Sequence, residues 1–135
     1  MEKQIHLLAN KGKCPVCNEI IQSYFRHNYV KCSCGASFTD GGQDYMRCSS
    51  NLHDLSVYSN QPFEVIREHW HRNGYGKDMQ GPYQSTVLCN MSDEYLQALM
   101  EFNIADFQKE FVEKEIQYRK QNNITITESK SIIHE

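Results

Sequence analysis

The chain has 135 residues, of which 39% are hydrophobic and 23% are charged, and its formal net charge is −3. This composition is typical of a globular protein and excludes a disordered chain, and no apolar run approaches the roughly 20 residues that a bilayer span needs. The acidic balance argues against a general nucleic-acid binder, because such proteins gather Lys and Arg to displace counterions from phosphates.

The number and spacing of the cysteines have to be interpreted together with the cellular compartment, because the compartment decides whether thiols stay reduced. The polar start of the chain, residues 1–6, lacks the apolar core of a signal peptide, so we expect no export. A reducing cytoplasm keeps thiols free, which makes a disulfide framework unlikely to explain the six cysteines. Metal binding is then the leading explanation for the clustered ones.

The N-terminal part of the chain, residues 13–47, predicts short strands joined by tight turns. Strands are expected over 19–25 and 28–32, which are rich in Ile, Tyr, Phe and Val. An Asp-Gly-Gly sequence that starts at Asp40 predicts a hairpin, because glycine supplies the positive φ of such turns. A further short strand is predicted over 55–58.

A central helix is predicted to follow. Pro62 suits the first turn of a helix, and apolar residues continue at spacings of three and four through Trp70, so the helix is expected to reach about Arg72. Three glycines and a proline make residues 73–82 a loop, and residues 83–89 form a predicted strand.

Two helices are expected near the C-terminus. Ser92 can cap the first, and Asn103 offers a cap for a second helix that runs to about Gln121. Beyond it, residues 124–127 can add an edge strand before a frayed end.

The second of these helices carries apolar residues over a broad arc and two favourable i, i+4 charge pairs, Glu110–Lys114 and Glu115–Arg119. Such an arc is wider than a lone surface helix needs. The helix is therefore either wedged between two parts of its own core or offers a surface for homo-oligomer formation.

The predicted fold class is α+β, with an N-terminal zinc-ribbon-like β module and a C-terminal helical part. Residues 1–50 form the β module, 51–90 hold the helix, the Gly-rich loop and a strand, and 91–135 hold the helical pair with an edge strand or tail. Residues 51–135 are expected to form one domain with residues 1–50.

Four cysteines in two pairs predict a metal site. Cys14 and Cys17 are separated by two residues, so one turn can aim both sulfurs at one ion. Cys32 and Cys34 are separated by one residue, which departs from the usual ribbon spacing, but alternate side chains of an extended strand point the same way. Four thiolates give a closed structural zinc site that helps a small segment to fold.

The remaining cysteines and histidines carry weaker signals. Cys48 and Cys89 are unpaired in sequence, and Cys48 is an alternative ligand should the one-residue spacing fail. His69 and His71 cannot grip one ion from a helix, because residues two apart point to nearly opposite sides. We find no phosphate loop, nucleophile elbow or paired-carboxylate motif, so an enzyme is the weaker hypothesis.

Two polar clusters, residues 40–47 and 72–78, each set an aromatic ring, a cation and an aspartate beside glycines. Such groups can stack on a ring, pair with a phosphate and accept from a sugar hydroxyl, although ordinary turn chemistry also explains either cluster alone. The candidate ligand-binding residues are Asp40, Asp44, Tyr45, Arg47, Tyr75 and Lys77.

Several of these stretches resemble small uncharacterised proteins of tailed bacteriophages. The resemblance rests on Cys14-Pro-Val-Cys17, Cys32-Ser-Cys34-Gly35 and the Asp-Gly-Gly-Gln-Asp-Tyr-Met-Arg stretch 40–47, and it covers most of residues 13–100. It implies a phage accessory protein in the cytoplasm of a bacterial host. Only the four cysteines are carried over from it, as zinc ligands, and no activity, further cofactor or catalytic residue is.

The leading functional hypothesis is therefore a non-enzymatic binding protein for host-defence evasion, which binds a nucleotide-derived signal or a host protein. One alternative is a zinc-ribbon adaptor that binds nucleic acid or the transcription machinery. A second alternative is a small nucleotide hydrolase with His53, His69 or His71 as its base.

Overall fold

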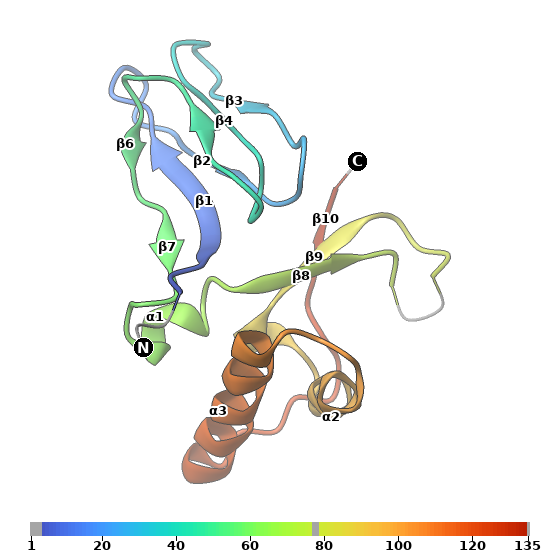
Figure 1. Ribbon diagram of the computed structural model, residues 1–135. Helices are drawn as coiled ribbons and strands as arrows, with labels where there is room; N and C mark the ends of the chain where they lie inside the picture. Colours follow the sequence, from blue (N-terminus) through green and yellow to red (C-terminus); the bar gives the residue numbers. More distant parts are fainter. Residues whose placement is uncertain (1–3, 77–78, 135) are drawn as a thin grey trace. The chain divides into compact units, whose positions relative to one another are not determined.

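The computed structural model describes residues 4–76 and 79–134, and it divides the chain into two compact units, the first ending at Gln61 and the second beginning at Pro62 (Figure 1). The described residues have mixed α and β structure, with three antiparallel sheets and three α-helices, in agreement with the predicted presence of both. None of the helices in this part of the chain combines the length and apolarity that a bilayer span demands.

The first unit consists of β-strands and turns. Its strands are β1 (Leu7–Lys13), β2 (Ile20–Ser23), β3 (Val30–Lys31), β4 (Phe38–Asp40), β5 (Arg47–Cys48), β6 (His53–Asp54) and β7 (Val57–Tyr58). Strand β1 pairs antiparallel with β2, β6 and β7, while β4 lies between β3 and β5 in a second sheet (Figure 1). Strands were correctly expected within 19–25, 28–32 and 55–58, but the longest one, β1, was not predicted.

The hairpin that joins β4 to β5 depends on its glycines, as predicted. Gly41 and Gly42 have φ values of 109° and 55°. A Cβ at Gly41 would lie 2.0 Å from the carbonyl oxygen of Tyr45, so no larger residue fits without moving the turn. The buried amide of Asn10, in β1, donates to the carbonyls of Asp40 and Tyr45, at 2.9 and 3.1 Å. Asn10 thereby ties the hairpin to the first sheet.

The second unit combines a small sheet with helices. Its elements are α1 (Phe63–Ile66), β8 (His71–Gly74), β9 (Gln84–Val87), the 3-10 helix η1 (Leu88–Asn90), α2 (Asp93–Glu101), α3 (Asp106–Asn122) and β10 (Ile132–Ile133). Strand β9 lies between β8 and β10, and α2 packs against α3 (Figure 1).

The central helix is much shorter than predicted. It ends at Ile66, and Arg72, where the helix was expected to end, lies in strand β8. Four residue pairs join β8 to β9, so sheet pairing prevails over the helical spacing of apolar residues. Trp70 is nevertheless buried, with its ring edge-on to Phe111 at 5.5 Å between centroids.

The C-terminal helices were predicted correctly in number but not in every boundary. Ser92 caps α2 as expected, accepting a hydrogen bond from the Tyr95 N–H at 3.1 Å. Helix α3 begins after Ala105, not at a cap by Asn103. The expected edge strand over 124–127 is absent from the described structure, because Ile126 is bonded to the start of α2 and β10 takes the edge of the sheet instead.

Helix α3 turns charged as well as apolar side chains toward the interior of the second unit, where they form ion pairs. The predicted Glu115–Arg119 pair exists at 2.8 Å, but both side chains are buried, at 0% and 3% exposure, and not on the surface. Arg67 adds two bonds to the same carboxylate, at 2.8 and 2.9 Å, and its guanidinium stacks over the Tyr118 ring. This arrangement shows that α3 serves the core of its own unit; its predicted role in homo-oligomer formation stays a prediction.

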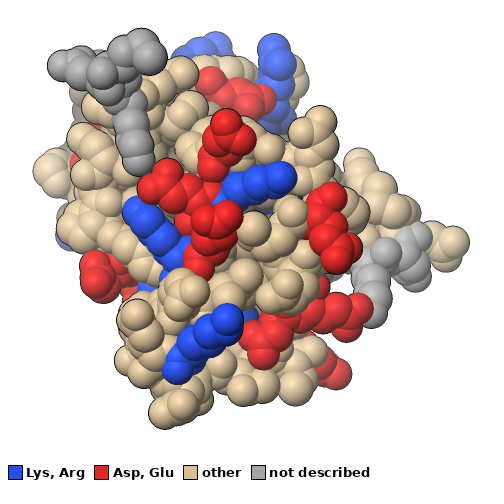
Figure 2. All heavy atoms as spheres, turned by 60° about the horizontal axis from the view of Figure 1, so that its bottom comes forward, with Lys and Arg blue, Asp and Glu red and all other residues tan. Residues whose placement is uncertain are grey.

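Charge is distributed unequally between the two units. The first has six Lys or Arg against five Asp or Glu, and the second has eight against twelve. Figure 2 views the molecule with α2 and α3 forward, and carboxylates gather there with a few basic side chains between them. A polyanion would therefore find more favourable charge on the first unit than on the second.

Candidate metal centre

The four cysteines predicted as metal ligands converge at the ends of strands β1 and β3 of the first unit. Their sulfur atoms all lie within 4.8 Å of one another. The Sγ atoms of Cys14 and Cys34 are 3.7 Å apart, and those of Cys32 and Cys34 are 3.5 Å apart. A tetrahedron of sulfurs bound at the Zn–S distance has edges of about 3.8 Å, so this cluster has the size of a single tetrahedral site.

Two similar turns bring the sulfurs together. In each turn the first cysteine, Cys14 or Cys32, is buried and the second is exposed. A residue with positive φ follows each second cysteine: Asn18 has a φ of 63° and Gly35 has a φ of 79°. This left-handed step reverses the chain so that both sulfurs of a turn face the same point.

Backbone amides point at the buried sulfurs. The Val16 N–H donates to Cys14 Sγ at 3.4 Å, and the Ser37 N–H donates to Cys32 Sγ at 3.3 Å. Hydrogen bonds to a thiolate favour its charged form, which is the form that binds a metal. The backbone therefore prepares both buried sulfurs for coordination.

A carboxylate links the two turns. Glu19 accepts from the Ser33 N–H at 2.7 Å and from the Ser33 hydroxyl at 3.2 Å. The backbone N–H of Ser33, followed by its hydroxyl, lowers the pKa of Glu19, because both bonds favour the ionised carboxylate. Since Glu19 follows the first turn and Ser33 lies between the cysteines of the second, this contact holds the turns in register.

The pKa values of two clustered thiols are shifted in opposite directions. A hydrogen bond from Ser37, helped by the Cys17 backbone N–H, lowers the pKa of Cys14 to about 6. The Ala36 N–H acts to lower the pKa of Cys34, but the neighbouring sulfurs, that of Cys32 most of all, outweigh it and raise that pKa to about 12. A divalent cation at the centre would reverse this balance, since coordinated thiols are deprotonated.

Apolar side chains pack against the buried sulfurs, and no further metal-ligating side chain joins the cluster among the described residues. Cys14 and Cys32 pack with buried Ile21 and with the partly buried Val30 and Leu52. Cys48, the alternative ligand considered from the sequence, lies exposed in β5 and does not belong to the cluster in the described residues. Four sulfurs without an additional donor describe a closed site, which suits structure more than catalysis.

The predicted ligand-binding residues divide between the two units. Asp40, Asp44, Tyr45 and Arg47 belong to the first unit, where Asp44 is exposed and the Tyr45 hydroxyl lies 3.3 Å from His27 Nδ1. Tyr75 belongs to the second unit and its ring contacts Tyr83, with centroids 4.9 Å apart. Lys77 lies outside the described residues.

One face of the β3–β4–β5 sheet assembles more binding groups than the sequence indicated. Phe38 and Asp40 share this face because they are two apart in β4, and their direct partners across the sheet are Lys31 and Arg47. The ring of Tyr29, which is 50% exposed, stacks on Phe38 with centroids 5.0 Å apart. The alternation of Tyr29 with Lys31 and of Phe38 with Asp40 is the sequence signal that could have identified this face.

Asp40 is unusual within this face. Its side chain is buried and forms an ion pair with the exposed Arg47 at 3.2 Å through Oδ2. Its other oxygen, Oδ1, is buried and is the one such side-chain atom in the described part of the chain that has no hydrogen-bond partner. A buried carboxylate oxygen without a donor is costly, and its burial keeps it out of reach of a ligand on the sheet surface.

The histidines considered as catalytic bases divide between the two units. His53 is exposed in β6 of the first unit. In the second unit, His71 is buried with Nδ1 placed 3.1 Å from the His69 carbonyl, and His69 Nδ1 is 2.8 Å from the Val65 carbonyl. Ring nitrogens held against carbonyls serve local structure, and this arrangement offers no independent support for hydrolysis.

Comparison with known proteins adds one finding. A family described as a domain of unknown function (DUF7695) matches residues 6–50, the stretch that contains β1 to β5, all four clustered cysteines and the Tyr29–Arg47 face. No curated protein and no solved structure matches the chain.

Proposed function

We propose that this chain is a non-enzymatic binding protein whose N-terminal unit is a zinc-ribbon-like module held together by one structural zinc ion. The observation that carries the proposal is the group of four sulfurs within 4.8 Å of one another. Thiolates are soft ligands, and a tetrahedral set of four is typical of Zn²⁺ in a structural role. Cys14, Cys17, Cys32 and Cys34 would hold it.

The module needs such an ion because its own core is small. The strands β3, β5, β6 and β7 have two residues each, and the cluster around Cys14 and Cys32 adds only three apolar neighbours. Sheets this small rarely fold without a staple, and metal binding supplies folding free energy directly. Zinc would therefore set the spacing between β1 and the β3–β4–β5 sheet.

Purified protein tests the zinc assignment through one variant and its control. Cys34→Ser removes a clustered ligand and should reduce zinc, measured by elemental analysis after dialysis, well below one ion per chain. Cys48→Ser removes an exposed thiol outside the cluster and should leave one zinc per chain. Equal zinc contents in the two variants would exclude the cluster as the binding site.

The binding face that this module presents consists of Tyr29, Lys31, Phe38, Asp40 and Arg47. Stacked aromatic rings can hold a base, and the two cations can pair with phosphate. The Arg47 guanidinium also lies 5.8 Å from the Phe38 ring centroid. These groups support a nucleotide-derived ligand, and the resemblance to phage proteins supports a host-defence signal in a bacterial cytoplasm as its source.

Calorimetric titration with mononucleotides and cyclic dinucleotides tests this ligand class. Arg47→Ala should weaken binding by about tenfold, as expected for loss of a charge-assisted contact. Lys13→Ala removes an equal charge from the other sheet of the same unit and should leave binding unchanged. Absence of binding by any of these nucleotides, with zinc fully loaded, would reject the ligand class without affecting the zinc assignment.

Single-stranded nucleic acid is a second candidate, favoured by the exposed Tyr29–Phe38 stack and by the slightly basic balance of the first unit. A gel shift with an oligonucleotide at low and high salt separates the two, because counterion release makes nucleic-acid affinity fall steeply with salt. A host protein as partner would leave both assays negative.

A further inference from the structure

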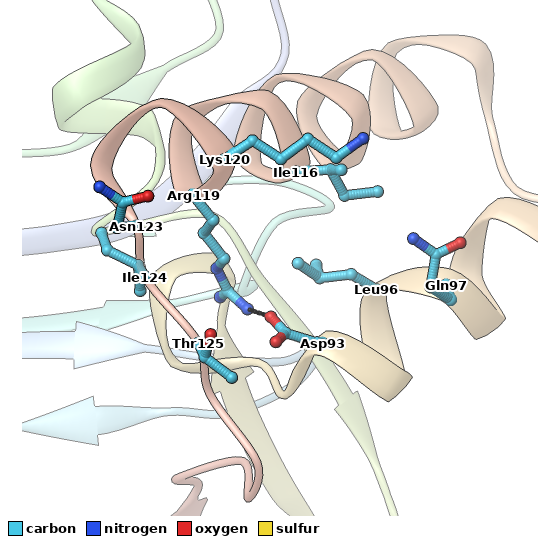
Figure 3. A pocket seen from close by; sticks show the side chains of 9 residues that line it. All are labelled: Asp93, Leu96, Gln97, Ile116, Arg119, Lys120, Asn123, Ile124 and Thr125. Atoms are coloured by element: carbon cyan, nitrogen blue, oxygen red, sulfur yellow. Dashed lines mark hydrogen bonds and ion pairs between the residues drawn. The ribbon is translucent and has the colours of Figure 1, made fainter.

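A cavity between α2 and α3 of the second unit has no role in the function proposed above. Its volume is about 410 Å³, which lies within the range of small-molecule sites. Figure 3 shows Leu96 of α2 and Ile116 of α3 pointing into the space between the helices, while Asn123, Ile124 and Thr125 close another side. Three aliphatic side chains thus form its walls.

The charges of Arg119 and Asp93, which line the cavity, are already neutralised. Arg119 donates through Nε to Glu115 at 2.8 Å and through Nη1 to Asp93 at 2.9 Å. Its Nη2 donates to the carbonyls of Leu88 and Cys89. With Arg67 bonded to the same Glu115 carboxylate, two guanidinium groups offset two carboxylates. A ligand therefore meets no net charge from these four residues.

Lys120 supplies one unbalanced positive charge. It is exposed, and no ion pair to it exists among the described residues. Figure 3 shows its side chain running along α3 past Ile116, toward the side of the cavity where Gln97 lies. Within residues 4–76 and 79–134, one N–H of Arg119 Nη1 also has no acceptor, since this nitrogen carries two donors and forms one bond. One cation and one spare donor around apolar walls suit a single anionic group.

From this balance we infer that the cavity binds a small monocarboxylate with a compact apolar body. The carboxylate would pair with the Lys120 ammonium, and the body would pack against Leu96, Ile116 and Ile124. A dianionic phosphate fits less well, because Asp93 borders the same cavity and only one cation is unbalanced. The inference concerns the second unit alone and does not depend on zinc.

The test is an NMR titration of the zinc-loaded full chain with 4-methylpentanoate, followed through the methyl signals of Leu96, Ile116 and Ile124. A ligand of this size should bind with a dissociation constant of about 1–10 mM. The neutral analogue 4-methylpentanamide should bind about fivefold or more weakly, because it lacks the charge that Lys120 recognises.

Two variants with the same change of charge complete the test. Lys120→Gln should weaken binding of the acid by about fivefold while leaving the amide unaffected. Lys114→Gln is the control, because Lys114 lies on the same helix but is paired with Glu110 at 3.2 Å. The inference is overturned if the three methyl signals do not respond, if acid and amide bind equally, or if Lys114→Gln weakens binding as much as Lys120→Gln.

Discussion

Replacing Glu115 with Gln tests the account of the second unit most sharply. The Glu115 carboxylate is fully buried and accepts three charge-assisted bonds, two from Arg67 and one from Arg119, at 2.8 to 2.9 Å. Without its charge, the buried Arg119 and the partly buried Arg67 lose the carboxylate that they share, and the half-exposed Asp93 pairs with Arg119 alone among the described residues. Breaking a buried pair in this way costs about 3–5 kcal/mol, because an uncompensated charge stays in the interior.

Urea unfolding followed by tryptophan fluorescence measures this loss. Trp70 is the single tryptophan of the chain and packs on Phe111, so its emission reports the second unit. Glu113→Gln, an exposed substitution on the same helix, should change the free energy of unfolding by less than about 0.5 kcal/mol. A loss below about 1 kcal/mol for Glu115→Gln would refute the reasoning, because that is the value of a surface ion pair.

Two further substitutions have definite expected effects. Gly41→Ala should destabilise the first unit by about 2 kcal/mol or more, read from amide hydrogen exchange, because its Cβ would meet the Tyr45 carbonyl, whereas Gly74→Ala has open space and should be nearly neutral. Burial, and then the nearby His71, lower the pKa of His134, so its contribution to stability is complete above pH 6.5 and is lost as pH falls through 6.5 toward the lowered value. His134→Gln should flatten this dependence in thermal unfolding; an unchanged profile would contradict the assignment.

The convergence of the four cysteines was predictable because turn chemistry is local. Each thiolate pair lies in its own tight turn, so a single reversal of the chain between the two turns is enough to bring the four sulfurs together. The Asp40-Gly41-Gly42 hairpin was predictable for the same reason, since positive φ restricts the residue type strongly. The identity of the metal stays a prediction, because a sulfur cluster restricts the metal without naming it.

Features that depend on partners distant in sequence were missed. Strand β1 contains three consecutive buried residues, Leu8, Ala9 and Asn10, so it lacks the alternation that marks a half-exposed strand. Residues after Ile66 have helical spacing, yet β8 forms because β9 supplies its hydrogen bonds. The i, i+4 spacing of Glu115 and Arg119 is also typical of a surface ion pair. Burial of Glu115 depends on Arg67, which lies 48 residues earlier in the chain and bonds to its carboxylate.

The central claim is that one zinc ion, bound by four sulfurs, holds the N-terminal unit together. X-ray absorption at the zinc edge on the purified protein tests it directly. The account predicts one zinc per chain with four sulfur neighbours at about 2.3 Å and no lighter ligand. Protein without zinc, or zinc with oxygen or nitrogen in its first coordination shell, would contradict it.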